Sequence, residues 1–173
     1  FNPEEFDIVM FGGGQDYEQT VVAKDLQNKK DTLIEYIEDD GVVVAICGGF
    51  QLLGRYYVNA SGERLNGISA IDVCTNGQFP NRLIGDVEIF NEEFGETYLG
   101  YENHIGRTYL GKNMKPLGKV VKGYGNNEED HAEGCHYKNV FCSYFHGPIL
   151  VRNQHLADRI IQTAAQRRIE KNA

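Results

Sequence analysis

Apolar runs along the chain stop abruptly at three places, each time at residues that suit a sharp turn. The runs cover residues 7–11, 42–46 and 140–145, and they are followed directly by a glycine triplet, by Cys47 and by His146. Short continuous apolar runs predict strands that are buried on both faces, as in a parallel sheet. Parallel strands present their carboxyl ends at one edge of the sheet, so we expect the three turns to gather there.

The segments between and after these runs favour helices. A helix is predicted from residue 15 or 16 to Gly41, with apolar residues at near-helical spacing: Val22, Leu26, Leu33 and Ile37. Residues 50–58 predict a second helix directly after Cys47. A third helix is predicted to be capped near Asn153, and its expected apolar face consists of Leu156, Ile160, Ile161, Ala164 and Ile169.

The middle of the chain, residues 65–121, has a different character. Strand-like pieces at 68–73, 83–90 and 119–121 are separated by many glycines and asparagines. This pattern predicts antiparallel strands and long loops over the active site. Residues 123–129 predict a polar turn or a mobile loop.

Together these patterns predict one α/β domain over residues 1–173. We expect an open, mostly parallel sheet flanked by helices, with a strand-and-loop insertion in the middle. The hydrophobic fraction of 41% and charged fraction of 24% are ordinary for a soluble globular protein.

The net charge of −8 argues against a nucleic-acid-binding protein, because no basic stripe is present to displace counterions from phosphates. The cations Arg167, Arg168 and Lys171 are predicted to form the solvated face of the last helix. No apolar run approaches the roughly 20 residues that span a bilayer. The first residues do not resemble a signal peptide. These features predict a cytoplasmic protein.

Four cysteines occur, at positions 47, 74, 135 and 142, and none of them forms a CxxC pair. A zinc ribbon, a thioredoxin-type redox site and a disulfide framework are therefore disfavoured, and no metal site is predicted.

Cys47 lies in the segment VVVAICGGFQLLG, where a predicted strand meets a predicted helix. A cysteine at such a turn is exposed at the edge of the sheet, and the helix N-terminus should favour its thiolate. The amide of Gly48 would point to the place where an oxyanion forms. A side chain at Gly48 or Gly49 would block the approach of the backbone. The alternative is a buried structural cysteine, but the flanking strand, glycine pair and helix favour a nucleophile.

A cysteine nucleophile needs a proton acceptor, and the sequence offers His146 for this role. His146 follows the last buried strand, so it should emerge at the same edge as Cys47. Taken alone it is equally compatible with a structural turn histidine. His104 is a second candidate base, whereas His131, His136 and His155 are predicted to lie on the surface.

The glycine turn at residues 11–15, FGGGQ, matches neither a P-loop nor a dinucleotide-binding fingerprint. Its backbone amides could supply a second oxyanion donor, for which we select Gly13. An ordinary turn at the end of a strand explains the same residues equally well.

Three ordered motifs between residues 12 and 150 resemble those of class I, triad-type glutamine amidotransferases, in the branch of cobyric acid synthase. The nucleophile motif is CGGFQLLG at residues 47–54, and GYENHIGRT at residues 100–108 is similar to a motif of that branch. NVFCSYFHGPIL at residues 139–150 resembles the histidine motif. The resemblance implies the flavodoxin-like fold of these amidotransferases, and an activity that releases ammonia from L-glutamine.

The same resemblance implies roles for individual residues. Cys47 would form a thioester with the glutamine carboxamide, and His146 would move the protons. Gly13 and Gly48 would hold the oxyanion. Gln51 would orient the substrate. Arg82, whose alternative is an ordinary charge at a strand edge, would bind the glutamine α-carboxylate.

Two departures from the family pattern concern the start of the chain and the third triad residue. The family has a strand and a helix before the glycine turn, and this chain begins almost at that turn. Most triad enzymes carry an acid two residues after the histidine, and Pro148 occupies this position here. Glu102 is a competing acid from within the chain, although we expect it in a loop over the site.

Within this branch, FGGGQDYEQ and ENHIGRT most resemble small glutaminase subunits that pair with a Mur-ligase-like synthetase. Such a heterodimer amidates the D-glutamate of lipid II to D-isoglutamine at the inner face of the membrane. ATP and magnesium would then bind to the partner, and this chain would need no cofactor. The alternatives are an amidotransferase domain of a cobyrinate-type amidase, a non-catalytic scaffold subunit and an unrelated cysteine hydrolase.

Overall fold

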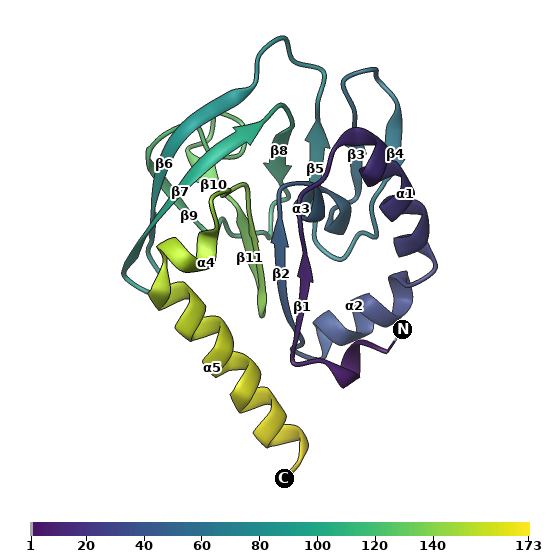
Figure 1. The fold of residues 1–173 in the computed structure, drawn as a ribbon, viewed down its shortest axis with the longest axis vertical. Coiled ribbons are helices and arrows are strands. Elements are labelled where there is room, and N and C mark those ends of the chain that lie inside the picture. Colours follow the sequence, from purple (N-terminus) through teal and green to yellow (C-terminus); the bar gives the residue numbers. More distant parts are fainter. Residues whose placement is uncertain (1) are drawn as a thin grey trace.

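The apolar run at residues 42–46 forms β2 (Val42–Ile46), an inner strand of a four-stranded sheet in the computed structural model, which describes residues 2–173. β1 (Ile8–Phe11) and β12 (Val140–Ser143) pair with β2 in parallel on its two sides. β11 (Cys135–Tyr137) adds an antiparallel strand beside β12. All three strands predicted from apolar runs therefore form, and they lie next to one another in the order β1-β2-β12. Figure 1 shows β1 beside β2.

β2 contributes to two hydrophobic cores, one on each face of the sheet. Val43 and Ala45 belong to the core under α1 (Asp16–Gln27), α2 (Lys30–Glu38) and α3 (Gly48–Leu53). Val42 and Val44 belong to the core that α5 (Gln154–Lys171) and the inserted strands cover. Successive side chains of a strand point to opposite faces, so burial on both sides requires a continuous apolar run.

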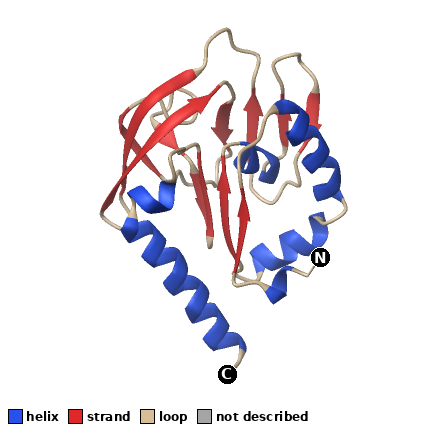
Figure 2. Cartoon of the chain, in the orientation of Figure 1, coloured by secondary structure: helices blue, strands red, loops and turns tan. Residues whose placement is uncertain are grey.

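The inserted residues form two further four-stranded sheets (Figure 2). The first is antiparallel and has the order β10-β9-β6-β7, with β6 (Leu83–Asn91), β7 (Glu96–His104), β9 (Gly118–Lys122) and β10 (Ala132–Glu133). The second has the order β4-β3-β5-β8, with β3 (Tyr56–Val58), β4 (Arg64–Asn66), β5 (Val73–Asn76) and β8 (Arg107–Leu110). Apart from the parallel pair β3–β5, the prediction of antiparallel strands for this region is confirmed.

Three predicted elements have different bounds in the structure. The helix expected up to Gly41 is divided into α1 and α2. The helix expected at residues 50–58 ends at Leu53, and its last three residues form β3 instead. The chain can turn back after Gly54 because glycine has no side chain. A Cβ at this position would lie 2.6 Å from Val73 Cγ2 and 2.8 Å from the Val73 carbonyl oxygen. The strand expected at 68–73 is wrong, because β5 begins only at Val73.

The last helix has a narrower apolar face than the sequence predicts. Leu156, Ile160 and Ala164 are buried, but 58% of Ile161 and 63% of Ile169 are exposed. Asn153 lies at the N-terminus of α5, yet its side chain does not cap the helix. Its amide instead exchanges hydrogen bonds with the backbone of Leu99, and so it fastens the helix to β7.

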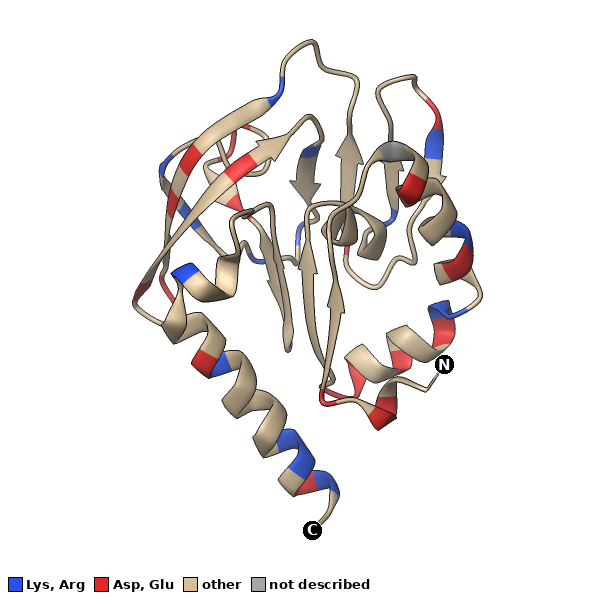
Figure 3. Ribbon diagram, viewed as in Figure 1, with Lys and Arg blue, Asp and Glu red and all other residues tan. Residues whose placement is uncertain are grey.

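The basic residues at the end of α5 are not a free solvated face. Arg167 and Lys171 both form ion pairs with Glu4 of η1 (Pro3–Glu5) and with Asp39. Figure 3 shows basic positions gathered at the C-terminal end of α5. α4 (Ile149–Arg152), a single short turn, connects the region after β12 to α5. None of the described helices has both the length and the apolar character that crossing a bilayer requires.

Candidate active site

Cys47 stands at the sharp turn between β2 and α3, as the sequence predicts. Its backbone has φ 53° and ψ −108°, in the left-handed half of conformational space that residues other than glycine rarely adopt. Such a conformation costs on the order of 1–3 kcal/mol and persists where the surrounding structure enforces it. The turn therefore presents the sulfur at the carboxyl edge of the parallel strands.

Both glycines after Cys47 lie in close packing, against the backbone at Gly49 and against the end of the Gln19 side chain at Gly48. A Cβ on Gly49 would lie 2.6 Å from Phe11 Cβ, and one on Gly48 would lie 2.7 Å from Gln19 Nε2. The Gly49 amide also donates a hydrogen bond to the Gly12 carbonyl. The sharp turn at Cys47 and the glycine turn after β1 are consequently held against each other.

Gly13, Cys47 and His146 meet at one point. A Cβ placed on Gly13 would lie 3.2 Å from Cys47 Cβ, 3.7 Å from Cys47 Sγ and 3.7 Å from His146 Cε1. The three turns that follow the predicted strands thus converge, as expected for parallel strands. The contribution of the Gly13 and Gly48 amides to an oxyanion site stays a prediction.

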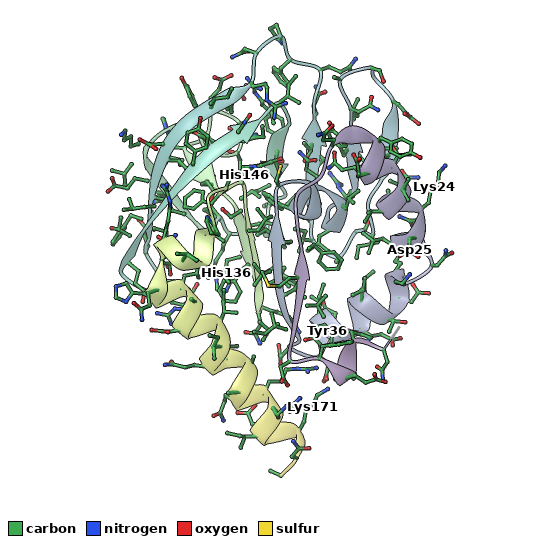
Figure 4. All side chains as sticks on the ribbon, in the orientation of Figure 1. Lys24, Asp25, Tyr36, His136, His146 and Lys171 are labelled. Atoms are coloured by element: carbon green, nitrogen blue, oxygen red, sulfur yellow. The ribbon has the colours of Figure 1, made fainter. Side chains whose placement is uncertain are left out.

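His146 follows β12 and is held in place by β7. Its backbone amide donates a 2.7 Å hydrogen bond to the Tyr101 carbonyl. Figure 4 shows His146 at the end of the sheet toward which β1 and β2 point. Its Nε2 is buried and has no hydrogen-bond partner among residues 2–173. Burial lowers the pKa of His146, and the charges of His104 and Arg82 lower it further. The imidazole is therefore neutral at physiological pH and can accept a proton.

The thiol of Cys47 is not activated on its own. Burial raises its pKa above the ordinary value, and this outweighs the opposing effects of the Gly48 amide hydrogen bond and of Arg82. The Gly48 amide at the start of α3 thus favours the thiolate, as expected of a helix N-terminus, but the desolvation of the sulfur outweighs it. The resting pair consists of a thiol and a neutral imidazole.

A pocket of about 560 Å³ opens in front of Cys47, within the range of small-molecule sites. Arg82 lies at its rim. Its Nε donates to Asn103 Oδ1 at 2.9 Å and its Nη2 donates to the Asn103 carbonyl at 3.0 Å. The remaining lining comes mainly from α1 and from the GYENHIGRT segment: Gly14, Gln15, Tyr17, Glu18, Gln19, Gln51, Tyr57, His104, Ile105 and Gly106.

Gln51 lines this pocket, but both ends of its amide are occupied within the protein. Its Oε1 accepts a 2.6 Å hydrogen bond from Gln19 Nε2, and its Nε2 donates to the Tyr144 hydroxyl at 3.1 Å. Tyr144 in turn bonds to Thr108 Oγ1 at 2.5 Å. The sequence did not indicate Gln19 or Tyr144, although Gln19 belongs to the FGGGQDYEQ segment and Tyr144 precedes His146 by two residues. The role of Gln51 toward a substrate stays a prediction.

Glu102 and His104 lie on the inner face of β7 and are fully buried, so the expectation that Glu102 belongs to a loop is wrong. The Glu102 carboxylate accepts hydrogen bonds from the amides of Tyr124 and Gly125. The His104 ring stacks on Tyr144, with 3.7 Å between the ring centroids. No hydrogen bond joins Glu102 to His146 among the described residues, so Glu102 is not placed as a direct triad acid.

The other histidines do not contribute to the pocket. His131 and His155 are exposed, as predicted. His136 is largely enclosed and stacks on Phe141, so its assignment to the surface is wrong. Among residues 2–173, no group of three or more His, Cys, Asp or Glu side chains is arranged to hold a metal ion.

Comparison with known proteins gives a consistent family. Residues 2–154 match the CobB/CobQ-like glutamine amidotransferase domain. The chain is 58% identical over 168 residues to the lipid II isoglutaminyl synthase (glutamine-hydrolyzing) subunit GatD of Streptococcus pneumoniae (strain ATCC BAA-255 / R6), which covers 97% of this chain and 65% of that protein. It is 44% identical over 165 residues to the subunit of the same name in Staphylococcus aureus (strain N315), covering 95% and 66% respectively. The chain thus spans slightly less than two thirds of these relatives.

A more distant relative is a probable cobyric acid synthase of Methanothermobacter thermautotrophicus (strain ATCC 29096 / DSM 1053 / JCM 10044 / NBRC 100330 / Delta H). It is 36% identical over 118 residues, with 61% of this chain and 23% of that protein covered. A solved glutamine amidotransferase superposes with a TM-score of 0.67 at 18% identity, covering 94% of this chain and 81% of the other, which supports the fold. The extent of the family match shows that this chain belongs to the CobB/CobQ-like glutamine amidotransferase domain family.

Proposed function

We propose that this chain is the glutaminase subunit of a two-component amidotransferase and hydrolyses L-glutamine to glutamate and ammonia. The observation that carries the proposal is the meeting of Cys47, Gly13 and His146 at one point, with Cys47 facing a pocket whose rim holds Arg82. A nucleophile, a neutral base, backbone amides and a cation are the groups that amide hydrolysis of an amino acid requires.

The chemistry follows from the protonation states of the resting pair. Neutral His146 accepts the thiol proton of Cys47 while Sγ attacks the carboxamide carbon of glutamine, and the amides of Gly48 and Gly13 hold the oxyanion. Protonated His146 then gives its proton to the departing nitrogen, so ammonia leaves and a thioester remains. Water next attacks the thioester and transfers a proton to His146, which returns it to Cys47 sulfur as glutamate departs.

Arg82 is assigned to binding rather than to chemistry. Two N–H groups of its guanidinium are already held by Asn103. The remaining pair of guanidinium N–H groups has the geometry that suits a carboxylate. Its positive charge also lowers the pKa of Cys47, and so it favours formation of the thiolate. Gln51 would orient the substrate through its fixed position beside the nucleophile.

The names of the similar proteins suggest where the ammonia is used. Two of them are described as subunits of lipid II isoglutaminyl synthase, which fits delivery of ammonia to a second subunit. We assign that subunit as an ATP-dependent, Mur-ligase-like synthetase that amidates the D-glutamate of lipid II to D-isoglutamine. ATP and magnesium would bind to the partner, whose lipid-linked substrate would bring this cytoplasmic subunit to the inner face of the membrane. The net charge of −8 gives no support to a nucleic-acid partner.

The decisive experiment uses Cys47→Ala in the complex with the synthetase. We expect amidation of lipid II to stop when glutamine is the nitrogen donor and to continue when free ammonium is supplied, because only ammonia release has been removed. Cys74→Ala is the matched control, since this cysteine lies on β5 and does not line the pocket. Glutamine-dependent amidation at an unchanged rate in Cys47→Ala would return this chain to the role of a non-catalytic scaffold.

A cobyrinate-type amidase is the second candidate, supported by the 36% identity to a probable cobyric acid synthase. The two proposals differ in the acceptor. Lipid II and a corrinoid carboxylate can be offered in turn to the complex with labelled glutamine, and transfer of the label to the corrinoid alone would favour the second candidate.

A further inference from the structure

Arg107 is a fully buried cation at the start of β8, and the proposed reaction does not use it. Its side chain is 0% exposed, and it follows Ile105 and Gly106, which line the pocket in front of Cys47. A cation removed from water is costly unless hydrogen bonds and an opposite charge compensate for it. The contacts of this guanidinium therefore indicate what the buried charge is used for.

Both terminal nitrogens of the Arg107 guanidinium donate hydrogen bonds to other parts of the chain. Nη1 donates to the carbonyl oxygens of Asn81 at 2.8 Å and of Ile105 at 2.7 Å. Nη2 donates to Glu128 Oε1 at 3.0 Å and to Asn81 Oδ1 at 3.4 Å. The guanidinium carbon lies 4.4 Å from the centre of the Phe79 ring. One planar group thus joins three segments, which a lysine cannot do because its donors all belong to a single nitrogen.

The segment that receives most of these contacts is the loop of residues 77–82, which connects β5 to β6. The loop contains neither helix nor strand, and most of its residues are exposed. Its last residue is Arg82, which we assign to the α-carboxylate of glutamine. The loop is therefore held at two adjacent residues, by Arg107 at Asn81 and by Asn103 at Arg82 itself. Asn103 and Arg107 both belong to GYENHIGRT, so this segment supports the loop from one side.

We propose that Arg107 is a positioning residue for substrate binding, which holds residues 79–81 so that Arg82 presents its remaining N–H groups to the α-carboxylate of glutamine. The inference rests on the proposed function, since it takes glutamine as the substrate and Arg82 as the group that binds its carboxylate. Arg107 itself is buried and acts only through the loop.

The first test is Arg107→Lys, which keeps the charge and removes the planar fork. In the complex with the synthetase, KM for glutamine should rise about three- to tenfold with a much smaller change in kcat, because Arg82 is displaced while nucleophile and base stay in place. Arg159→Lys is the matched control and should behave like the wild type. Arg159 also pairs with a carboxylate, Glu96 at 2.6 Å, and lies over an aromatic ring, Phe94 at 3.6 Å, but it does not line the pocket.

A substrate without the α-carboxylate separates lost positioning from general damage to the site. This substrate is γ-aminobutyramide, which is glutamine without that carboxylate, and its kcat/KM should be nearly the same for Arg107→Lys and the wild type. A structural defect around the site would instead lower kcat/KM for both amides. The double variant Arg82→Ala/Arg107→Lys should have the same KM for glutamine as Arg82→Ala alone, because both substitutions act through one contact.

Limited digestion with trypsin reports on the loop without any need for catalysis. Trypsin cuts after arginine, and loosely held exposed loops are preferred sites of cleavage. In the full-length subunit, cleavage between Arg82 and Leu83, identified by fragment mass, should be faster in Arg107→Lys than in the wild type or in Arg159→Lys. Circular dichroism verifies folding. If Arg107→Lys does not fold, Phe79→Ala removes the stacked ring from the loop side and should change KM and cleavage in the same directions.

An unchanged KM for glutamine in a folded, active Arg107→Lys complex would overturn the proposal, whatever the digestion shows. An equal loss of kcat/KM for glutamine and γ-aminobutyramide would overturn it as well. A wild-type complex that releases no ammonia from glutamine would overturn the proposed function instead, and faster cleavage after Arg82 would then assign Arg107 to the stability of the loop alone.

Discussion

Arg82 is fastened to Asn103 by two hydrogen bonds, from Nε to the side-chain oxygen at 2.9 Å and from Nη2 to the backbone carbonyl at 3.0 Å. The two residues lie side by side in space, because the next residue after each of them, Leu83 of β6 and His104 of β7, pairs with the other. The guanidinium is thereby held at the rim of the pocket, where a side chain of its length would otherwise be free to move.

Arg82→Ala should therefore raise KM for glutamine and leave folding nearly unchanged. A lost charge-assisted contact with a carboxylate is worth about 1.5–3 kcal/mol, or roughly ten- to a hundred-fold in affinity. Steady-state kinetics of the complex measures the effect. Arg64→Ala is the control, because that exposed arginine packs on Tyr56 and does not line the pocket. A KM that stays the same would make Arg82 an ordinary surface charge.

Gly13→Ala should lower kcat with little change in KM. Its Cβ would lie 3.2 Å from Cys47 Cβ, so Cys47 would have to shift by a few tenths of an ångström, whereas Sγ and the His146 ring at 3.7 Å are at ordinary contact distance. This shift would misplace the nucleophile relative to the base. A displacement of this kind in an active site costs about ten- to a hundred-fold in rate. Gly12→Ala is a closely matched control, since a Cβ at that position meets nothing within 4 Å. Equal rates for the two variants would contradict the assigned geometry.

Glu133→Gln should make stability less dependent on pH. Glu133 is fully buried and accepts hydrogen bonds from the Tyr144 amide and Ser143 hydroxyl, and burial raises its pKa to about 8. Between the ordinary value of 4.5 and about 8, the folded chain holds a proton that the unfolded chain has released. The stabilisation from this proton is complete below the lower value and disappears as the pH rises through the upper one.

Urea unfolding of the wild type and Glu133→Gln at pH 5 and pH 9 measures this difference. We expect the wild type to lose a few kcal/mol relative to the variant across that interval. Glu129→Gln, at an exposed carboxylate, should follow the wild type at both pH values. Parallel behaviour of wild type and Glu133→Gln would mean that Glu133 is ionised throughout.

The isolated chain should be a poor glutaminase, because we expect the acid that orients His146 to come from the partner. Pro148 stands where a triad acid is usual and only precedes α4, so the residue two positions after His146 cannot orient the imidazole. In a serine protease, loss of the orienting acid costs about four orders of magnitude. Glutaminase rates with and without the synthetase test this, followed by neutral substitution of each acidic residue at the interface. Full activity of the chain alone would exclude the idea.

The parts of the fold that are visible in the sequence are those with simple hydrophobic patterns. β2 is buried on both faces and reads as VVVAI, so both its position and its sharp end at Cys47 could be predicted. β7 was missed because its inward positions are Tyr98, Gly100, Glu102 and His104, which do not alternate as apolar against polar. Polar side chains on the inner face of a strand conceal it from any argument based on hydrophobicity.

The residues of the site also divide into those that the local hydrophobic pattern reveals and those that it does not. Cys47 and His146 could be predicted because each directly follows a buried apolar run. Tyr144 could not be distinguished from a core residue of the run VFCSYF, since its role depends on hydrogen bonds with Gln51 and Thr108 from other elements. The position of β3 depends on the close contact of Gly54 with Val73, which is equally invisible from the local sequence.

The hydrogen bond between the Tyr101 carbonyl and the His146 amide links the inserted sheet to the parallel one, and it has a consequence for how the protein matures. The nucleophile, the pocket wall and the base come from three distant stretches of chain. Closing such long loops costs entropy before the contacts compensate for it, so these pairings should form late in folding. Return of glutaminase activity after dilution from denaturant should accordingly trail the return of secondary structure, and a partly folded subunit would have a thiol but no base to activate it.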